Sequence, residues 1–246
     1  MGQPDQEEER IRQVYARRDA SGKTARYYWQ RQDVIYITYR YRSVLARALQ
    51  CLGINDLSPL HVLDVGCGSG GWLRLLLEWG ASPERLHGVD LLPDRIARAQ
   101  ALSPAGVDWR VGNAVGLDFA DGSMDLCAAS TVFSSILDPA ARLALAQEMA
   151  RVVRPGGYIM ILDYVVSAPS NPDTVGIRQK EISRLFPELS LLHIFKLIFP
   201  PRCCGCSPPN YWAWPIYWKT LCRLSAPTGC LCCKSKVFPE LARTER

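Results

Sequence analysis

A glycine-rich segment that follows a short apolar run has the composition of a ligand-binding turn. The segment reads VLDVGCGSGGWL, residues 62–73, and a helix is predicted to begin near Trp72. Glycine is needed where the backbone turns tightly and must approach a ligand without a Cβ atom in the way. Asp90 ends the next predicted strand, where a carboxylate can accept hydrogen bonds from both hydroxyls of a ribose. The pattern therefore predicts a ligand containing a nucleoside at the carboxyl ends of the strands.

Two ligands fit this turn. Gly66, Gly68 and Gly71 spell GxGxxG, the dinucleotide fingerprint, although a lone match of this kind is weak. Asp64 lies two positions before the first glycine. A carboxylate there would repel a pyrophosphate but would suit the ammonium group of S-adenosylmethionine. The residues favour S-adenosylmethionine, and a glycine-rich turn without a ligand is the third interpretation.

Successive segments between residues 60 and 165 resemble the signatures of class I S-adenosylmethionine-dependent methyltransferases, in that family's order. They are VLDVGCGSG, GVDLL, VGNA, DGSMDLCAAST and RVVRPGGYIMILD. Flanking segments are similar to a narrower bacterial group of small methyltransferases, type 11-like, associated with polysaccharide or secondary-metabolite pathways. These segments are YARRD, WGASPERLHGVDLLPDRIARA, TVFSSILD, SNPDTVGI and EISRLFPEL.

The resemblance implies a role in cofactor binding for ten residues. The methionine end would be held by Asp64, Gly66, Gly68 and Gly70, the ribose by Asp90, the adenine by Leu91, Asn113 and Ala114, and the methyl end by Ser130 and Thr131. Asn113 departs from the family's usual acid near the adenine amine, but its side-chain oxygen can accept the same hydrogen bond. The implied cofactor is S-adenosylmethionine, and the implied product is S-adenosylhomocysteine.

Few residues could act as a general base. Asp163 ends the fifth predicted strand and is the best candidate for a base or a substrate-orienting group, with a carboxylate that caps a loop as an equal alternative. Ser134 and Ser135 stand where the wider family sometimes has a His pair. His61 and His87 flank the starting ends of two strands and are expected to be structural.

The candidates for acceptor contacts are mostly in the N-terminal part. Tyr15, Arg18 and Tyr28 could reach the acceptor from a helical lid, and an arginine there would suit a carboxylate or phosphate. A solvated basic helix face is the alternative interpretation. Tyr164, beside the candidate base, could shape the pocket or simply pack.

Apolar runs and helical patterns alternate along the middle of the chain, which predicts a parallel sheet covered on both faces. Strands are expected at 60–66, 86–92, 107–114, 124–131, 157–166, 189–199 and 229–237, and helices at 6–19, 34–53, 72–80, 93–103, 139–153 and 177–189. The predicted fold is α/β: a doubly wound, mostly parallel, seven-stranded Rossmann-like sheet with an N-terminal helical extension. Its parts are a lid (1–55), a cofactor-binding core (56–198), an insertion rich in Pro, Cys and Trp that covers the acceptor site (199–227), and a last strand with a tail (228–246).

Composition narrows the classes of function. The 246 residues carry a net charge of +5, with basic ends and an acidic middle, and no nucleic-acid-binding module is recognisable. The polar N-terminus has no apolar leader segment, which predicts a cytoplasmic protein. Seven of the 10 cysteines lie in the last 44 residues, in CC and CxC spacings that do not match metal-binding knuckles, so no metal is predicted. Weak contact with a membrane surface is possible for the aromatic stretch 210–218, and a monomer or a homodimer is expected.

The predicted function is methyl transfer to a small-molecule acceptor, by O-methylation of a sugar, glycolipid or secondary metabolite. A catalytically silent partner subunit with the same fold is the alternative, because no general base is evident. An NAD(P)-dependent oxidoreductase rests on the glycine fingerprint alone and ranks last.

Overall fold

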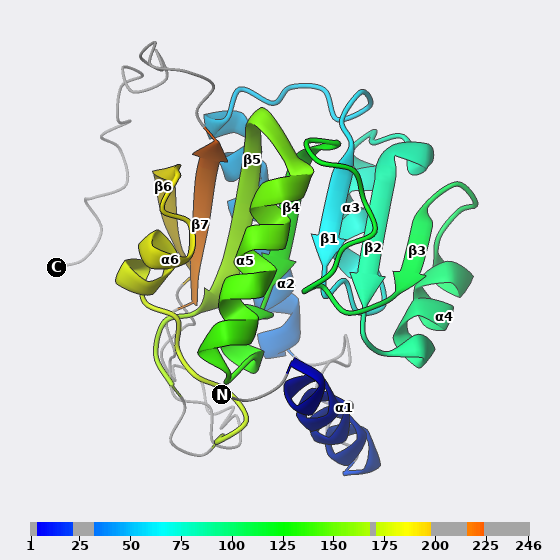
Figure 1. Ribbon diagram of the computed structural model, residues 1–246. Helices are drawn as coiled ribbons and strands as arrows, with labels where there is room; N and C mark the ends of the chain where they lie inside the picture. The colour runs from blue at the N-terminus through cyan, green and yellow to red at the C-terminus, as the bar shows by residue number, and fades with distance from the viewer. Residues whose placement is uncertain (1–3, 22–31, 168–170, 198–215, 224–246) are drawn as a thin grey trace, which may run out of the picture.

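The computed structural model describes residues 4–21, 32–167, 171–197 and 216–223. Seven strands form one sheet in the order β3-β2-β1-β4-β5-β7-β6 (Figure 1). The strands are β1 (Val62–Val65), β2 (Leu86–Asp90), β3 (Asp108–Val111), β4 (Met124–Ser130), β5 (Val153–Tyr164), β6 (Leu189–Leu197) and β7 (Ile216–Arg223). The first five are parallel, and β7 runs antiparallel to both of its neighbours. The prediction of a mostly parallel, seven-stranded, doubly wound sheet is confirmed.

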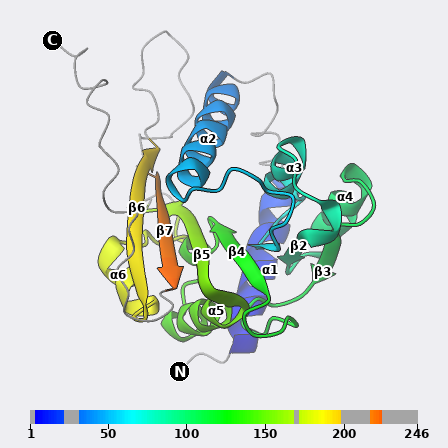
Figure 2. The same cartoon turned by 90° about the horizontal axis from the view of Figure 1, so that it is seen from above.

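Helices cover both faces of this sheet. They are α1 (Pro4–Ala20), α2 (Gln32–Cys51), α3 (Gly71–Glu78), α4 (Pro93–Leu102), α5 (Pro139–Val152) and α6 (Gln179–Leu185), with short 3-10 turns η2 (Pro83–Arg85) and η3 (Phe133–Ser135). Figure 2 shows α2, α3 and α4 on one side of the sheet and α5 and α6 on the other. Local sequence sets the helix starts: α5 begins at Pro139, and the Asp138 side chain accepts the Ala140 N–H at 3.1 Å as the N-cap.

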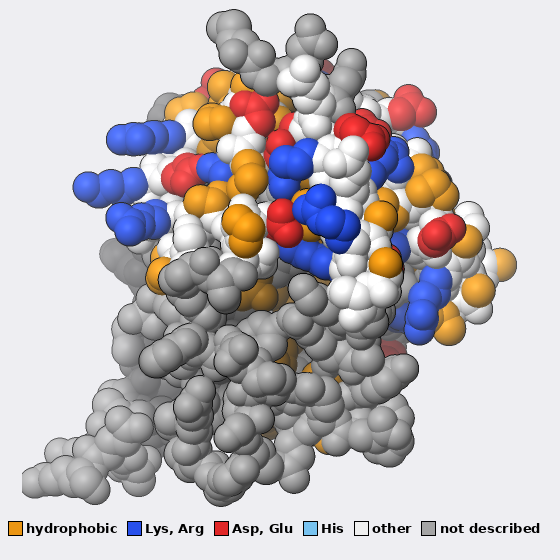
Figure 3. Space-filling view, turned by 90° about the horizontal axis from the view of Figure 1, so that it is seen from below, with side chains coloured by type: hydrophobic (Ala, Val, Ile, Leu, Met, Phe, Trp, Pro, Cys, Tyr) orange, Lys and Arg blue, Asp and Glu red, His pale blue; other side chains and the backbone are white. Residues whose placement is uncertain are grey.

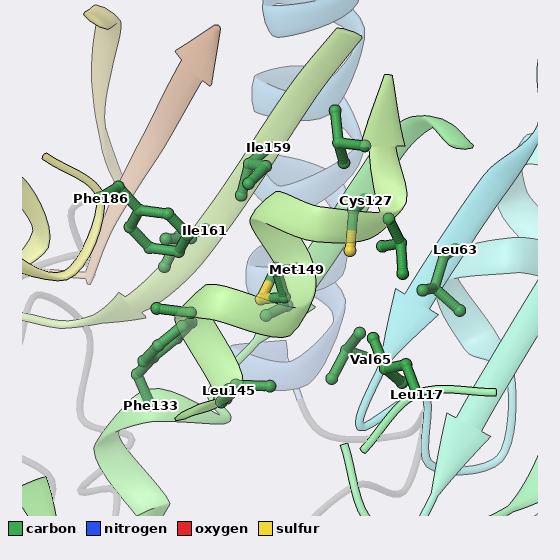
Figure 4. Close-up of a cluster of buried hydrophobic side chains, with 14 of the residues drawn as sticks. Leu63, Val65, Leu117, Cys127, Phe133, Leu145, Met149, Ile159, Ile161 and Phe186 are labelled. Atoms are coloured by element: carbon green, nitrogen blue, oxygen red, sulfur yellow. The ribbon is translucent and has the colours of Figure 1, made fainter. Parts of the chain in front are cut away.

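Two apolar clusters fill the space between the sheet and its helices. On one face, Leu145 and Met149 of α5 lie against Leu63, Val65 and other strand residues (Figure 4). On the other face, α2 and α3 pack over alternate residues of the same strands, such as Val62 and Leu126. Burial of each large apolar side chain contributes about 1.5–3 kcal/mol. Both clusters hold the strands in place, so the loops at the carboxyl ends of the strands have a rigid support.

One helix does not belong to either layer. The helix α1 lies beyond the carboxyl ends of β1 to β4, at the lower edge of the sheet in Figure 1. Ion pairs one turn apart, between Glu7 and Arg10 at 2.8 Å and between Glu8 and Arg12 at 2.7 Å, stabilise this polar helix. Within the described ranges, no helix combines the length and the apolar character that crossing a membrane requires.

The segment 199–227, predicted as an insertion, differs in part. Its residues Ile216–Arg223 form β7 between β5 and β6. The prediction missed this strand because the proline, cysteine and tryptophan residues around it masked a run of β-branched and aromatic residues, IYWKTLC, that suits a strand. The predicted strand at 229–237 lies outside the described residues, and so do the C-terminal cysteines other than Cys222, which is in β7.

Candidate cofactor pocket and active site

The turn between β1 and α3 has a backbone that only glycine adopts readily. Gly66, Gly68 and Gly70 have φ angles of 67°, 54° and 76°. A Cβ atom on Gly66 would lie 2.6 Å from Cγ2 of Val132. The Gly66 N–H also donates to the Val89 carbonyl at 2.8 Å, which holds the turn against the end of β2. The turn is therefore narrow and open to a ligand above it.

Asp90 stands at the end of β2 with both carboxylate oxygens engaged. Its Oδ2 accepts the Gly68 N–H at 2.8 Å, and its Oδ1 accepts the Leu92 N–H at 2.9 Å. The residue is 8% exposed and lines the adjoining cavity. Each carboxylate oxygen keeps a further lone pair. These can accept the two hydroxyls of a ribose, as predicted for this residue.

Asp64 is buried without a compensating cation in the described part of the chain. It is 3% exposed, and burial followed by the nearby charge of Asp90 raises the pKa of its carboxyl well above the usual value. An ammonium group of a ligand would relieve both effects, whereas a pyrophosphate would add to them. The carboxylate therefore fits the methionine end of S-adenosylmethionine.

Gly71 separates the two cofactors that share this fingerprint. In a dinucleotide site the third glycine permits close packing of helix and strand. Here a Cβ atom on Gly71 would meet no atom closer than Nη2 of Arg74 at 4.0 Å, and its φ is not positive. The third glycine therefore does not have the role that a dinucleotide site gives it, and the residues present fit S-adenosylmethionine.

A cavity of about 890 Å³, counted with its open mouth, extends from this turn along the carboxyl ends of β2, β3 and β4. Eight of the residues that line it were predicted as cofactor or acceptor contacts, and a ninth, Val65, directly precedes the glycine turn. They are Gly66, Asp90, Leu91, Asn113, Ala114, Ser130, Thr131, Tyr15 and Val65. The cavity is also lined by Glu7, Glu8 and Ile11, so α1 covers it. The described surface around α1 mixes positive and negative side chains (Figure 3).

The end of the cavity at the predicted adenine-binding residues is closed by polar contacts between α1 and the loop after β3. Asn113 Oδ1 accepts the Val115 N–H at 3.1 Å, and Asn113 Nδ2 donates to Glu8 Oε2 at 2.8 Å. Arg12, paired with Glu8, donates to the Leu91 carbonyl at 2.7 Å. The predicted adenine-binding residues Leu91 and Asn113 are therefore both in contact with α1.

The methyl end of the cavity contains a residue with a strained backbone. Thr131 has a φ of 56°, which is unusual for a β-branched residue, and its N–H donates to the Leu162 carbonyl at 2.8 Å. Ser130, next to it, hydrogen-bonds the side chain of Tyr41 on α2. Burial, and then the charge of Asp64, raises the pKa of Tyr41, so this phenol stays protonated. A strained residue beside a hydrogen-bonded pair of hydroxyls at the end of β4 is typical of a functional loop.

Asp163 is buried below this loop. Its Oδ2 accepts the Ser134 N–H at 3.1 Å, and its Oδ1 accepts the Tyr164 N–H at 2.8 Å. Burial raises the pKa of Asp163 to about 6, although these hydrogen bonds oppose the shift. The residue does not line the described cavity. These contacts are those of the loop-capping interpretation. Tyr164 packs against the apolar cluster formed with α2 and α3 and also does not line that cavity.

Of the predicted acceptor contacts, Tyr15 has the clearest position. It lines the cavity, and its ring lies below two guanidinium groups, Arg95 at 4.3 Å and Arg18 at 5.2 Å from the ring centre. Tyr28 lies outside the described residues. Glu7, Glu8 and Arg95 line the cavity but were missed by sequence reasoning, because charged residues on a polar helix usually indicate a solvated face.

Comparison with known proteins agrees with this geometry. Residues 62–157 match the family model of a methyltransferase domain. The chain is 35% identical over 116 residues to 2-methyl-6-phytyl-1,4-hydroquinone methyltransferase from Synechocystis, covering 46% of this chain and 35% of that protein. It is 30% identical over 119 residues to demethylmenaquinone methyltransferase from Bacillus licheniformis, covering 48% of each. The chain thus spans about half or less of the length of these two curated relatives.

Solved structures show the same fold. A methyltransferase dependent on S-adenosylmethionine from Methanosarcina mazei has a TM-score of 0.54 at 20% identity, covering 67% of this chain and 92% of that one. One from Mesorhizobium loti has a TM-score of 0.54 at 17% identity, covering 71% and 96%. The fold and the family-model match are those of a class I methyltransferase domain, whose cofactor is S-adenosylmethionine. The match covers residues 62–157, less than half of the chain, and shows the likeness of this segment to the methyltransferase domain family.

Proposed function

We propose that this protein is an enzyme that transfers a methyl group from S-adenosylmethionine to an oxygen of a small-molecule acceptor. The single observation that carries the proposal is the cavity along β1 to β4, which Gly66 and Asp90 line, with the buried carboxylate of Asp64 close to Asp90 behind its wall. This set of groups matches a ribose and an ammonium on one ligand.

The cofactor, when bound, supplies a methyl group on a positively charged sulfur that is already a good leaving group. The work of the protein is then to bind and to align, which can contribute about 7–11 kcal/mol to lowering the barrier. Asp90 would hold the ribose, and Asp64 and the glycine turn would hold the methionine end. Thr131, fixed to Leu162, and Ser130 would define the wall beside the methyl group.

The chemistry of the described cavity favours an acceptor that ionises easily. Its described acidic residues are Glu7, Glu8 and Asp90, and each is already hydrogen-bonded. Arg10 and other donors outweigh burial and lower the pKa of Glu7, while Arg12 lowers the pKa of Glu8. Groups with lowered pKa values are weak bases. An aromatic hydroxyl needs less help from a base than a sugar hydroxyl does.

Two relatives are named for a hydroquinone and for demethylmenaquinone, and these names support a quinone-type aromatic acceptor without indicating the atom that is methylated. We therefore rank aromatic acceptors first and the hydroxyls of sugars and glycolipids second. Tyr15 and Arg18 would contact the acceptor from α1, and we propose that Asp163 acts by holding the loop that follows β4. The acceptor, the assembly and the cellular location of the whole protein are part of this proposal.

Calorimetric titration with S-adenosylmethionine, S-adenosylhomocysteine and NADH tests the cofactor first. Binding of both adenosyl ligands, with none for NADH, is expected. A panel of hydroquinones, catechols and sugars, with S-adenosylhomocysteine release as the readout, then tests the acceptor. Turnover with sugars alone would overturn the ranking. Adenosyl binding without turnover on any acceptor would support a silent partner subunit instead.

A further inference from the structure

The loop after β3 presents a hydrogen-bond donor to the cofactor cavity where the family usually has an acid. The Asn113 carbonyl oxygen is turned back onto its own loop and accepts the Val115 N–H at 3.1 Å. The amide nitrogen therefore points the other way and donates to Glu8 at 2.8 Å. An adenine has an exocyclic amine, which is also a donor, so this side chain does not present its best acceptor to it.

An acid from the helix α1 takes the place of the acid that the loop after β3 lacks. Glu8 lines the same cavity as Asn113, Ala114 and Leu91, although it is 105 residues away from Asn113 in the sequence. Its Oε1 accepts two donors of Arg12, at 3.0 and 2.7 Å, and within the described residues its Oε2 accepts a hydrogen bond from the Asn113 amide alone. Hydrogen bonds from Arg12 and then from Asn113 lower the pKa of Glu8, so the carboxylate is ionised at neutral pH. A carboxylate oxygen can accept two donors, so Oε2 has room for another.

The orientation of Glu8 is fixed rather than incidental. Arg12 links it to the Leu91 carbonyl at 2.7 Å, directly after the ribose-binding residue of β2. On the same helix, Glu7 accepts the Leu137 N–H at 2.6 Å, and Arg10 donates to the Ser135 carbonyl at 2.6 Å. These contacts join α1 to the loops after β2 and β4, while Glu8 joins it to the loop after β3.

From these contacts we infer that Glu8 is a cofactor-binding residue: its carboxylate accepts the exocyclic amine of the adenine, in place of the acid that Asn113 lacks. Asn113 then positions Glu8 instead of contacting the amine itself. Glu8 has this role only if the cavity binds an adenosyl ligand, so the inference rests on the proposed function.

The test compares two ligands on each variant by calorimetry. One is S-adenosylhomocysteine, and the other is its 6-deamino analogue, in which hydrogen replaces the exocyclic amine. The wild-type protein should prefer the amine by about tenfold or more, the usual effect of a hydrogen bond to a charged group. Glu8→Ala should bind both ligands about equally. Glu9→Ala is the matched control, because Glu9 is exposed on the same helix and its carboxylate accepts a hydrogen bond from Gln13 of that helix. This variant should keep the preference for the amine.

A swap of the two groups provides a second arm. In the double variant Glu8→Gln with Asn113→Asp, the carboxylate and the amide exchange places across the 2.8 Å contact, and the preference for the amine should return. If Glu8 served only to dock α1, Glu8→Ala would weaken both ligands and leave their ratio unchanged, which would overturn the inference. Equal binding of both ligands by the wild-type protein would also overturn it. If the folded wild-type protein bound neither ligand, the proposed function would fail as well.

Discussion

The carboxylate of Asp163 on β5 accepts the backbone N–H of Ser134, 3.1 Å away in the loop that follows β4. This contact ties the end of one strand to the loop that carries the strained Thr131. The same carboxylate is 4% exposed, so its charge lies in a poorly solvated place. The arrangement holds the loop in shape at some cost in stability when the group is ionised.

The pH dependence of stability should reveal this cost. Burial raises the pKa of Asp163 to about 6, whereas a free aspartate carboxyl has a pKa of 3.8. A raised pKa in the folded state gives stability that is present at acidic pH and is lost as the pH rises through about 6. Relative to Asp163→Asn, the wild-type protein should therefore lose roughly 2 kcal/mol of unfolding free energy between about pH 4.5 and 7. Urea unfolding of both proteins at these two pH values measures the difference. A difference that does not change with pH would contradict the assigned burial.

Loss of the Asp90 carboxylate should abolish cofactor binding. Asp90→Ala removes the acceptor for the ribose and leaves the Gly68 and Leu92 N–H groups without their partner. Affinity for S-adenosylhomocysteine should fall by about 100-fold or more. Asp90→Asn keeps the shape of the side chain and therefore serves as a control for unfolding. Its affinity for S-adenosylhomocysteine should also fall. The exposed Asp94 lies four residues further on, and Asp94→Asn should bind like the wild-type protein. Unchanged affinity in both Asp90 variants would disprove the ribose site.

Most of the central sheet could be predicted because each strand is an apolar run that ends in a distinctive residue. Val62–Val65 ends at Gly66, and Leu86–Asp90 ends in the acid itself. Parallel strands place such ends along one edge, so the local sequence also predicts the site. The strand β7 is different, because its partners β5 and β6 precede it in the chain and its neighbours in sequence include Pro, Cys and Trp.

The contacts made by α1 could not be predicted from the sequence. A run of three glutamates in a polar helix indicates a solvated surface, and nothing in its spacing shows that Glu8 contacts Asn113. Asp163 could be placed at the correct edge, but the direction of its side chain depends on the path of the loop after β4. The local sequence determines where a residue lies along a strand, whereas the packing of the whole fold determines which residue its side chain contacts.

The histidine pair at the opposite edge of the sheet should make the fold sensitive to acid. Arg85 donates to His61 Nε2 at 2.9 Å, so the proton of His61 is on Nδ1 and faces His87 Nε2 at 3.5 Å. His87 in turn uses Nδ1 toward Asp108 at 3.1 Å. With these assignments both rings are neutral, because a second proton on either ring would point at a neighbouring hydrogen-bond donor.

The direction of this change in stability with pH follows from the pKa of His87, which is lowered mainly by burial despite the opposing effect of Asp108. A histidine with a lowered pKa in the folded state loses stability as the pH falls below about 6.5. The charged neighbours in this network are Arg85, Arg110 and Asp108. His87→Gln removes the titrating group, so the variant should lose less unfolding free energy than the wild-type protein between about pH 7.5 and 5.5. An equal loss in both proteins would assign the acid sensitivity to other groups.

Replacing each of two adjacent glycines in the turn by alanine should have different effects on the free energy of unfolding. Gly70 has a φ of 76°, and a Cβ atom there would overlap the ring of Trp109, whereas Gly71 begins α3 in open space. Gly70→Ala should lower the unfolding free energy by about 1–3 kcal/mol through backbone strain and overpacking. Gly71→Ala should leave it unchanged or raise it by up to about 1 kcal/mol, because alanine suits a helix better than glycine does. Thermal unfolding of the two variants measures these changes.

Gly71→Ala should also keep its affinity for S-adenosylhomocysteine, since the third glycine of a dinucleotide fingerprint has no packing role here. If that variant lost the ligand while remaining folded, the turn would have to approach its ligand more closely than this geometry implies.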